Sequence, residues 1–527
     1  MIATSDKWKT AHLETLLPET FVEITYDVTE PGVQSSATES NDGAAYFSDH
    51  GAIVDTTPKT FKLYATLENN LWGLSGEHDL VPDNAPYGDT GYVSRSAVRD
   101  TAIPVVTISF GKVQEQPIPG ITLTWSSRYG EYATRFRVSA YNGTTQLTSQ
   151  EFTNSNVKTI CNIELYGYSE IRIEILEWSH PGHRARMERV VIGVSHTYAK
   201  GDLMNYTHTQ SGDLLSAELP KNAISFSLDN STGMWNPNNP SGYVRYLAER
   251  QQITVRYGMK LGDNVEWIDA GTFWVSEWDT PSNGLEVRFS ARDIIEFLSE
   301  TYTGPKKGTL YYIAQSALEQ AELPLQESGA KRYVLSDNLK EWTVDFSEDD
   351  SEHTLAEVVQ LCANAACCVM YQNRKGVLYV EPLREAASGH AIRSSICYAH
   401  PEFKLTKILK SVSVNDGMGT ATNDTKGEVQ TLSNKLITSD TMANRVADWV
   451  KEILKGRRTV SCEFRADPSL DVFDKVAIES SYGLNNAVYI TEVEYTFSGS
   501  FHGKMTGRIT DFETEEWFLG ELRSGEV

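Results

Sequence analysis

One short stretch, residues 220–240 with the sequence PKNAISFSLDNSTGMWNPNNP, most constrains what this chain can fold into. It begins with alternating apolar residues, Ile224, Phe226 and Leu228, and this period of two indicates a half-buried strand. A turn rich in Pro and Asn follows, and a second apolar run begins at Gln252. The stretch contains no nucleophile beside a base and no metal-ligand spacing. The pattern therefore predicts a strand and a corner of a structural β-barrel.

The length and the charge of the chain limit its function. Its 527 residues predict three or four domains. With 47 basic and 71 acidic residues, the net charge is −24, which disfavours binding nucleic acid through clustered Lys and Arg. Such a charge suits either simple solubility or a surface past which nucleic acid slides without sticking. We therefore expect no specific nucleic-acid binding.

The cysteines and the hydropathy of the chain indicate where it is made. No Cys-x-x-Cys pair is present, and the six cysteines are typical of small buried residues in a reducing compartment. They are Cys161, Cys362, Cys367, Cys368, Cys397 and Cys462. Residues 1–15 lack the apolar core of a secretory signal, and no run approaches the length of a membrane span. We expect synthesis in a cytoplasm and no membrane span.

Changes of pattern along the chain predict a discontinuous first domain. Residues 1–42 and 196–300 share one strand texture and are predicted to form a first β-barrel. Residues 43–195 contain six to eight short strands, with a hairpin signal at Asn142-Gly143. This rhythm is typical of a β-sandwich or jelly roll. An exposed loop tolerates such an insertion when its two ends lie close together.

The second half of the chain is predicted to contain an α+β domain and a second barrel. Residues 301–395 mix helices and strands, and Thr354-x-x-Glu357 in this segment is a capping box. Residues 396–515 read as a second β-barrel with one helix, and residues 516–527 as an acidic tail. The predicted fold class is therefore mainly β with an α+β middle: two tube-like β-barrels, an inserted β-sandwich (jelly roll) and an α+β domain.

Three groups of strand-and-turn motifs carry a resemblance to a known family. They are Gly201–Pro220 with Phe226–Asn230, Trp235–Pro240 and Ile253–Gly258; Gly271–Ser276 with Val287–Asp293; and Asp467–Val476 with Ile490–Phe497 and Gly507-Arg508. In order and spacing they resemble the tail hub, or baseplate hub, of tailed bacteriophages. The resemblance covers about 370 residues, everything outside the inserted segment. One departure is Phe473-Asp474, where the family often has Gly-Asp, which puts the turn there in question.

The resemblance implies a structural part and no enzymatic activity. Hub proteins of this kind carry two tube-like barrels per chain and assemble as homotrimers, so that six similar barrels adapt a trimeric tip to a hexameric tube. The implied location is the virion, at the tail tip or baseplate, with tail-tube, tape-measure and receptor-binding proteins as partners and DNA passing through the lumen at genome ejection. Barrel and assembly contacts are expected at Phe226, Leu228, Trp235, Phe273, Trp274, Tyr495 and Phe497.

The inserted segment resembles galactose-binding-like jelly rolls, which occur in many carbohydrate-binding modules. The resemblance implies binding of a host cell-surface glycan and a part in host attachment. Sugars bind such folds by stacking on aromatic faces beside fixed polar groups. The candidate residues are Trp72, Tyr87, Tyr92, Arg95, Trp125, Tyr129, Trp178, His180 and His183. The alternative for each Trp is a place in the core.

Metal sites and catalysis have weaker signals. Asp79, Asp83 and Asp89 are candidates for a structural calcium loop in the inserted segment, and no other cofactor is expected. His180 and His183 have no third ligand nearby in sequence, which favours an exposed loop over a metal pair. Phosphate-binding loops, nucleophile elbows and the HExxH motif are absent. Two other functions stay open: a dedicated receptor-binding adhesin, and a cell-wall-degrading tail-tip enzyme.

Overall fold

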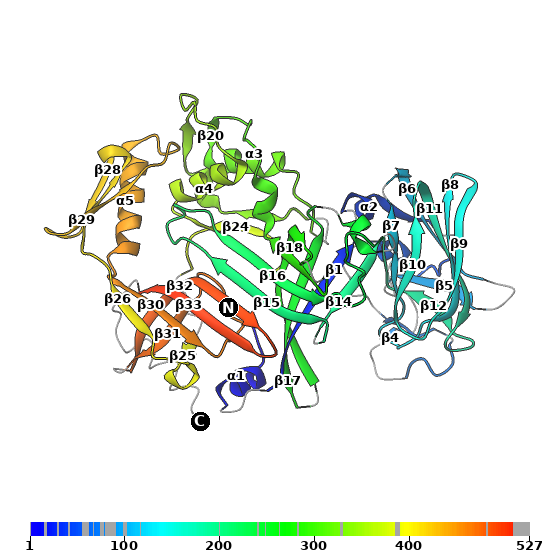
Figure 1. The fold of residues 1–527 in the computed structure, drawn as a ribbon. Helices are drawn as coiled ribbons and strands as arrows, with labels where there is room; N and C mark the ends of the chain where they lie inside the picture. The colour runs from blue at the N-terminus through cyan, green and yellow to red at the C-terminus, as the bar shows by residue number, and fades with distance from the viewer. Residues whose placement is uncertain are drawn as a thin grey trace.

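The computed structural model of this chain is mainly β, with few helices and mostly antiparallel sheets (Figure 1). It describes residues 2–14, 18–28, 31–40, 43–54, 63–66, 68–73, 78–79, 91–98, 103–115, 117–199, 201–239, 242–247, 249–262, 264–281, 284–326, 330–384, 390–480 and 483–509. No helix in these ranges combines the length and the apolar character needed to cross a membrane.

Thirteen of the described strands form one sheet, here called the large sheet. Its first group of strands is β1 (Thr20–Val28), β14 (Val194–Tyr198), β15 (Leu203–Ser211), β16 (Lys221–Asp229), β17 (Gln252–Leu261), β18 (Asn264–Asp279) and β19 (Glu286–Arg292). Its second group is β25 (Ala391–Ile392), β26 (Glu402–Leu405), β30 (Arg458–Phe464), β31 (Lys475–Ser480), β32 (Gly483–Phe497) and β33 (Phe501–Ile509). The two groups correspond in sequence to the two predicted barrels, and barrel closure stays a prediction.

One antiparallel pairing joins the two groups. Strand β15 pairs with β32, in a register that runs from Tyr206 opposite Phe497 to Ser211 opposite Glu492. The strand order is β14-β1-β17-β18-β19-β16-β15-β32-β33-β30-β26, with β31 pairing β32 and β25. Segments from the middle and the last thirds of the chain are therefore hydrogen-bonded side by side, as the adjacent blue-green and red strands of Figure 1 show.

The alternation noted at residues 220–240 explains how this sheet buries its core. Strand β16 buries Ile224, Phe226 and Leu228, while Ser225 on the opposite face is exposed. The same core receives Trp8 from helix α1 (Asp6–Leu13), which begins at the N-cap Ser5. Both strand groups contribute to this one core, so each group is covered in part by the other.

A polar network lies inside this core. Burial lowers the pKa of His208 to about 4, so its ring is neutral near pH 7. The ring therefore donates from Nε2 to Oδ1 of Asn222 (2.8 Å) and accepts at Nδ1 from the hydroxyl of Tyr257 (2.7 Å). The Tyr206 hydroxyl donates to that of Tyr257 (2.8 Å). Every member has a partner, which makes the network compatible with deep burial.

The chain leaves the large sheet for the insert, residues 31–193, and returns to the sheet next to the point where it left. Strand β1 ends at Val28, which lies opposite Val194 at the start of β14. Helix α2 (Pro31–Ser36) and β2 (Ala37–Ser40) already belong to the insert, because β2 pairs with its strand β6. The predicted first segment, residues 1–42, therefore ends too late: its last described strand belongs to the insert's sheet. In Figure 1 the insert stands to one side of the large sheet.

The insert has a core of its own between a five-stranded and a three-stranded sheet, with strand orders β2-β6-β11-β8-β9 and β10-β7-β13. The predicted hairpin at Asn142-Gly143 is confirmed, because β8 and β9 pair up to Asn142 and Thr145 across this turn. The remaining elements are η1 (His50–Ile53), β3 (Leu63–Tyr64), β4 (His78–Asp79), β5 (Tyr92–Ala97), β6 (Val105–Gln114), β7 (Ile118–Thr124), β8 (Ala133–Asn142), β9 (Thr145–Thr153), β10 (Lys158–Leu165), β11 (Tyr168–Trp178), β12 (Arg184–Met187) and β13 (Arg189–Val191).

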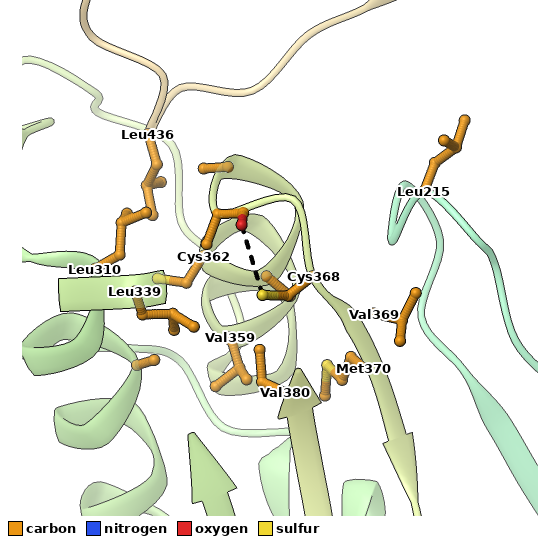
Figure 2. Close-up of a cluster of buried hydrophobic side chains, with 14 of the residues drawn as sticks. Leu215, Leu310, Leu339, Val359, Cys362, Cys368, Val369, Met370, Val380 and Leu436 are labelled. Atoms are coloured by element: carbon orange, nitrogen blue, oxygen red, sulfur yellow. Dashed lines mark hydrogen bonds between the residues drawn. The ribbon is translucent and has the colours of Figure 1, made fainter. Parts of the chain in front are cut away.

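An α+β unit packs over the large sheet (Figure 1). Its elements are η3 (Ile294–Leu298), β20 (Lys307–Thr309), α3 (Leu310–Gln320), β21 (Tyr333–Leu335), η4 (Asp337–Lys340), β22 (Thr343–Asp345), α4 (Leu355–Ala365), β23 (Val369–Gln372) and β24 (Leu378–Glu381). The predicted capping box is confirmed: Thr354 and Glu357 each accept the other's backbone N–H at the start of α4. Figure 2 shows its apolar core around Val359, Cys362 and Met370.

The helix expected inside the second barrel lies elsewhere. Helix α5 (Asp440–Leu454) packs on a small sheet of β27 (Leu409–Val414), β28 (Gly419–Thr422) and β29 (Glu428–Leu432). The apolar face of α5, which includes Met442 and Val446, joins the core of the α+β unit. Helix α5 therefore extends the α+β unit and is not part of the large sheet. The short helices η2 (Tyr243–Tyr246), η5 (Ser394–Ile396) and η6 (Asn415–Gly417) complete the described elements.

One buried arginine fastens the α+β unit to both strand groups. Arg374 lies in the turn between β23 and β24, and its Nε donates to the carboxylate of Asp471 (3.0 and 3.1 Å). Its Nη1 donates to the carbonyl of Asp269 in β18 (2.8 Å), and its Nη2 to the carbonyls of Pro468 and Leu470 (2.7 and 3.1 Å). A guanidinium is suited to this position because it carries five N–H donors in a fixed plane.

Candidate functional site

Three of the candidate residues in the insert surround one buried carboxylate, that of Glu131. Its Oε2 accepts the indole N–H of Trp178 (2.7 Å), and its Oε1 lies 2.6 Å from Nδ1 of His183. His180, whose side chain is exposed, stands 3.7 Å from the same oxygen and stacks on the ring of His183. The chain brings these groups together because the β11–β12 turn folds back over the loop that holds Glu131.

The histidine pair is therefore organised by a carboxylate that lies 49 residues earlier than His180. Burial by itself would lower the pKa of His183, but the hydrogen bonds to Glu131 and to the carbonyl of Asn69 outweigh it and raise the pKa. A protonated ring donates from both nitrogens, which suits these two acceptors.

A second buried ion pair adjoins this group. Arg186 donates from Nη1 and Nη2 to the two carboxylate oxygens of Glu68 (2.8 and 2.6 Å). Burial opposes ionisation of Glu68, but its bonds to Arg186, to Thr66 and to the backbone N–H of Arg184 lower its pKa below the usual range. The pair ties the segment around Glu68 to strand β12.

A partly exposed group of aromatic side chains lies next to Arg186. The guanidinium of Arg186 stands 5.2 Å from the ring centre of Tyr129, whose hydroxyl is 3.5 Å from Nε2 of His78. The ring of His78 lies 6.1 Å from that of Trp72, and the Trp72 indole donates to the carbonyl of Thr66 (2.6 Å). We call Trp72, Tyr129 and His180 the aromatic end of the insert.

The other candidates in the insert are placed differently. Trp125 and Tyr92 are fully buried, and the Trp125 indole donates to the hydroxyl of Thr159 (2.9 Å), so their ring faces pack inside the insert. Arg95 on β5 is exposed. Tyr87 lies outside the described residues.

Only one of the three residues of the predicted calcium loop lies in the described part of the chain. Asp79 belongs to strand β4, whereas Asp83 and Asp89 lie outside the described residues. Within the described ranges, no cluster of three or more His, Cys, Asp or Glu side chains could hold a metal ion. The calcium loop stays a prediction.

All seven residues expected to make barrel and assembly contacts lie inside the single chain. Phe226, Leu228, Trp235, Phe273, Tyr495 and Phe497 belong to the core of the large sheet, and Trp274 to the core of the α+β unit, each with at most 4% of its surface exposed. Phe273 and Trp274 are neighbours in β18, and the alternation of a strand sends them into opposite cores. These seven residues therefore build the chain and offer no surface to a second copy in this form.

The turn at Phe473-Asp474, where phage tail hubs often have Gly-Asp, has a left-handed backbone. Phe473 has φ = 67°, a conformation that a glycine adopts at less cost. Its ring is buried against Tyr371, with ring centres 5.8 Å apart, and its backbone N–H donates to the carbonyl of Ile490 (2.8 Å). Gly212 must be small because a Cβ there would lie 2.4 Å from the Phe473 ring.

Sequence reasoning missed Glu131, Glu68, Arg186 and His78. A single acidic or basic residue in a β-rich segment carries no local signal, because its role comes from a partner many residues away. The pair Tyr129 and His183, which the sequence did suggest, could have directed attention to the nearby Glu131.

Comparison with protein-family models finds no match, and neither does comparison with curated protein sequences. Solved structures of phage tail proteins are similar to this chain. The 43 kDa tail protein of prophage MuSo2 from Shewanella oneidensis is 12% identical, with a TM-score of 0.42 over 61% of this chain and 97% of its own. A tail protein from Neisseria meningitidis MC58 is 12% identical, with a TM-score of 0.42 over 60% and 94%. The prophage tail protein gp18 from Listeria monocytogenes EGD-e is 11% identical, with a TM-score of 0.36 over 62% and 95%.

Proposed function

We propose that this chain is a structural hub protein at the distal end of a phage tail tube. The observation that carries the proposal is the pairing of β15 with β32, which joins two strand groups from distant parts of the chain into one sheet. The sequence motifs that resemble tail hubs lie in these two groups, in the same order. Two strand groups joined into one sheet suit a scaffold better than a catalyst.

The proposed assembly is a homotrimer in the tail tip or baseplate of the virion. Three chains would present six similar strand groups to the tail tube and would adapt threefold to sixfold symmetry. The net charge of −24 favours a lumen through which DNA passes without binding. Tail-tube, tape-measure and receptor-binding proteins would be the neighbours.

The insert would add recognition of a host cell-surface glycan. Its aromatic end supports this proposal: Trp72 and Tyr129 are partly exposed, and His180, which stacks on His183, is exposed. Glu131 and Arg186 hold the neighbouring rings in place. Aromatic ring faces beside fixed polar groups are suited to binding sugars.

Mass determination and electron microscopy of the purified chain test the hub proposal. We expect a trimer, or rings in micrographs, in the isolated protein or in assembled tails. A stable monomer that binds cells would favour an adhesin instead. Cleavage of purified peptidoglycan would favour the enzyme.

A glycan array tests the insert on the full chain. We expect binding that Tyr129→Ala weakens at least tenfold, because the ring and its contact with Arg186 are both lost. Tyr166→Ala is the matched control, since Tyr166 is 62% exposed elsewhere on the insert. Equal loss in both variants, or no glycan binding by the folded protein, would contradict the glycan proposal and leave the hub proposal intact.

A further inference from the structure

Helix α1 connects the two strand groups of the large sheet and lies beside β17 (Figure 1). The backbone N–H of its N-cap Ser5 donates to Oε1 of Glu266 in β18 (2.9 Å), and the Ser5 hydroxyl donates to Oε2 of the same carboxylate (2.5 Å). At the other end of the helix, Nη2 of Arg465 donates to the carbonyl of His12 (2.8 Å). Because Arg465 directly follows β30, α1 is held from the side of each strand group.

The segment of α1 also holds the loop of residues 465–474, which connects β30 to β31. The backbone N–H of Ile2, shortly before the helix, donates to the carbonyl of Ser469 in this loop (2.8 Å). Arg374 of the α+β unit binds the same loop through two carbonyls and one carboxylate. The loop is therefore fastened by two separate parts of the chain, and release of α1 removes one of the two fastenings.

The face of α1 that packs on the core carries ring nitrogens that lack good partners. Trp8, Ala11 and His12 share this face by helical spacing, with 0%, 8% and 1% of their surfaces exposed. The indole N–H of Trp8 has no hydrogen-bond partner among the described residues. The His12 ring faces the backbone of Arg465, but neither ring nitrogen makes a hydrogen bond of normal geometry with a described residue. Buried polar groups in this state cost free energy, and release of the helix returns them to water.

The surroundings of His12 disfavour a positive charge on its ring. Burial is the largest effect, and Arg465 and His390 add repulsion, so the pKa of His12 is lowered. Asp467 and the backbone of Arg465 act in the opposite direction. The Asp467 carboxylate is shared with other groups, because one oxygen lies 3.5 Å from Nδ1 of His390 and the other accepts the backbone N–H of Ser469 (3.0 Å). The docked helix therefore favours a neutral His12.

We propose that α1 is a clasp across the joint of the two strand groups, and that acid releases it. Once α1 has left the sheet, water surrounds the His12 ring and its pKa returns toward the ordinary value of 6.5. The released helix therefore binds a proton more readily than the docked helix. Docking is most favourable above about pH 6.5, and it weakens as the pH falls below this value.

Release of the clasp loosens the joint from one side only. The guanidinium of Arg374 stays charged across this pH range and continues to bind the loop of residues 465–474. The two strand groups also stay joined through the ladder of β15 and β32. Acid therefore uncovers Trp8 and the part of the core on which it packs, while the large sheet remains one sheet.

Limited proteolysis of the full chain with proteinase K, which is active at pH 5.5 and at pH 8, tests the proposal. Cleavage after Trp8 requires release of α1, because this side chain is fully buried in the docked helix. Mass spectrometry of the early N-terminal fragments measures the rate. At pH 5.5, one unit below 6.5, protonation of the released form should raise the rate in the wild type by up to about tenfold.

A synthetic peptide of residues 5–12 gives the pH dependence of the protease itself, against which each rate is measured. His12→Gln lacks the titrating ring and should show only that dependence. His400→Gln, at an exposed histidine outside α1, is the matched control and should respond to acid as the wild type does.

A further variant keeps the test decisive if His12→Gln folds poorly. Glu266→Ala removes the acceptors of Ser5 and should speed cleavage after Trp8 by the same factor at both pH values. It retains His12 and should keep the acid response. A wild type that follows the peptide at both pH values, or that shares its acid response with His12→Gln, would overturn the proposal. So would a Glu266→Ala variant that is cleaved after Trp8 no faster than the wild type.

Discussion

The core of the insert is made entirely from residues 33–192, whereas the core of the large sheet draws on residues 8–291 without the insert and on residues 392–509. The insert buries its apolar faces between its own two sheets. The large sheet needs strands from two distant segments before either group is covered. The comparison separates a part that can fold from local sequence from a part that depends on the whole chain.

The connections of the two regions also differ in whether they link neighbouring or distant segments of the chain. The chain passes between the insert and the large sheet next to the Val28–Val194 pair, and near this crossing strand β7 of the insert also contacts β14 and η2. The large sheet is fastened by the β15–β32 ladder and by Arg374, each of which links distant segments. Damage to the insert should therefore stay local, and damage to the large sheet should spread.

Phe226→Asp should have the largest effect. A carboxylate in place of a ring that is 2% exposed costs more than about 4 kcal/mol, which is enough to unfold the large sheet. Limited proteolysis should then degrade the large sheet and leave an insert fragment intact. Ser225→Asp, on the exposed face of the same strand, is the control and should behave as wild type. Degradation of the insert together with the sheet would break the comparison.

Arg374→Met should destabilise the joint by about 3–5 kcal/mol. It removes the ion-pair partner of Asp471 and takes one donor from each of three carbonyls. Differential scanning calorimetry should show the transition of the large sheet at lower temperature and the transition of the insert unchanged. Lys375→Met is the control, because its side chain is exposed in the same turn.

Asp293→Asn should change how the stability of the large sheet depends on pH. Burial raises the pKa of Asp293 from 3.8 to about 7, with Arg292 and Glu296 as the charged groups that act on it. The folded state therefore binds the proton more tightly, and the wild type loses stability as pH rises from about 4 to 7. The variant lacks this loss, so its advantage should grow to about 4 kcal/mol by pH 8. Urea unfolding at pH 4 and pH 8 measures it, and an advantage that is the same at both would contradict the assignment.

Glu131→Gln should have the smallest of these effects and should be confined to the insert. The amide keeps one acceptor but turns an NH₂ group toward the N–H of Trp178 or His183, at a cost of about 1–3 kcal/mol. Calorimetry should show a lower temperature for the transition of the insert alone. Glu177→Gln, an exposed glutamate on β11, is the control. A shift in both transitions would show that the two regions are coupled.

Sequence patterns predicted the features that depend on neighbours in the chain. The Asn142-Gly143 hairpin and the Thr354 capping box follow from local hydrogen bonds, and both are confirmed. The alternation in β16 indicated its buried face for the same reason. Each of these features is decided within a few residues, so one sequence is enough.

What could not be predicted depends on partners far away in the chain. The β15–β32 pairing joins strands nearly 300 residues apart, and nothing in the alternation of either strand specifies the other. Glu131 gains its role only from Trp178 and His183 on another element. The left-handed backbone of Phe473 could not be predicted from sequence either. The free-energy cost of this conformation is offset by packing of the Phe473 ring against Tyr371 from the α+β unit.

The β15–β32 ladder also sets an order of events during synthesis. A ribosome that has released residues 31–193 has released everything that the insert needs for its core, so the insert can fold while the rest is still being made. Strand β15 must wait for β32, and until residues 492–497 emerge its edge is open to pairing with other chains. Slow translation of the insert itself would therefore be harmless. A pause of the ribosome between β19 and β32 would instead expose the nascent protein to aggregation.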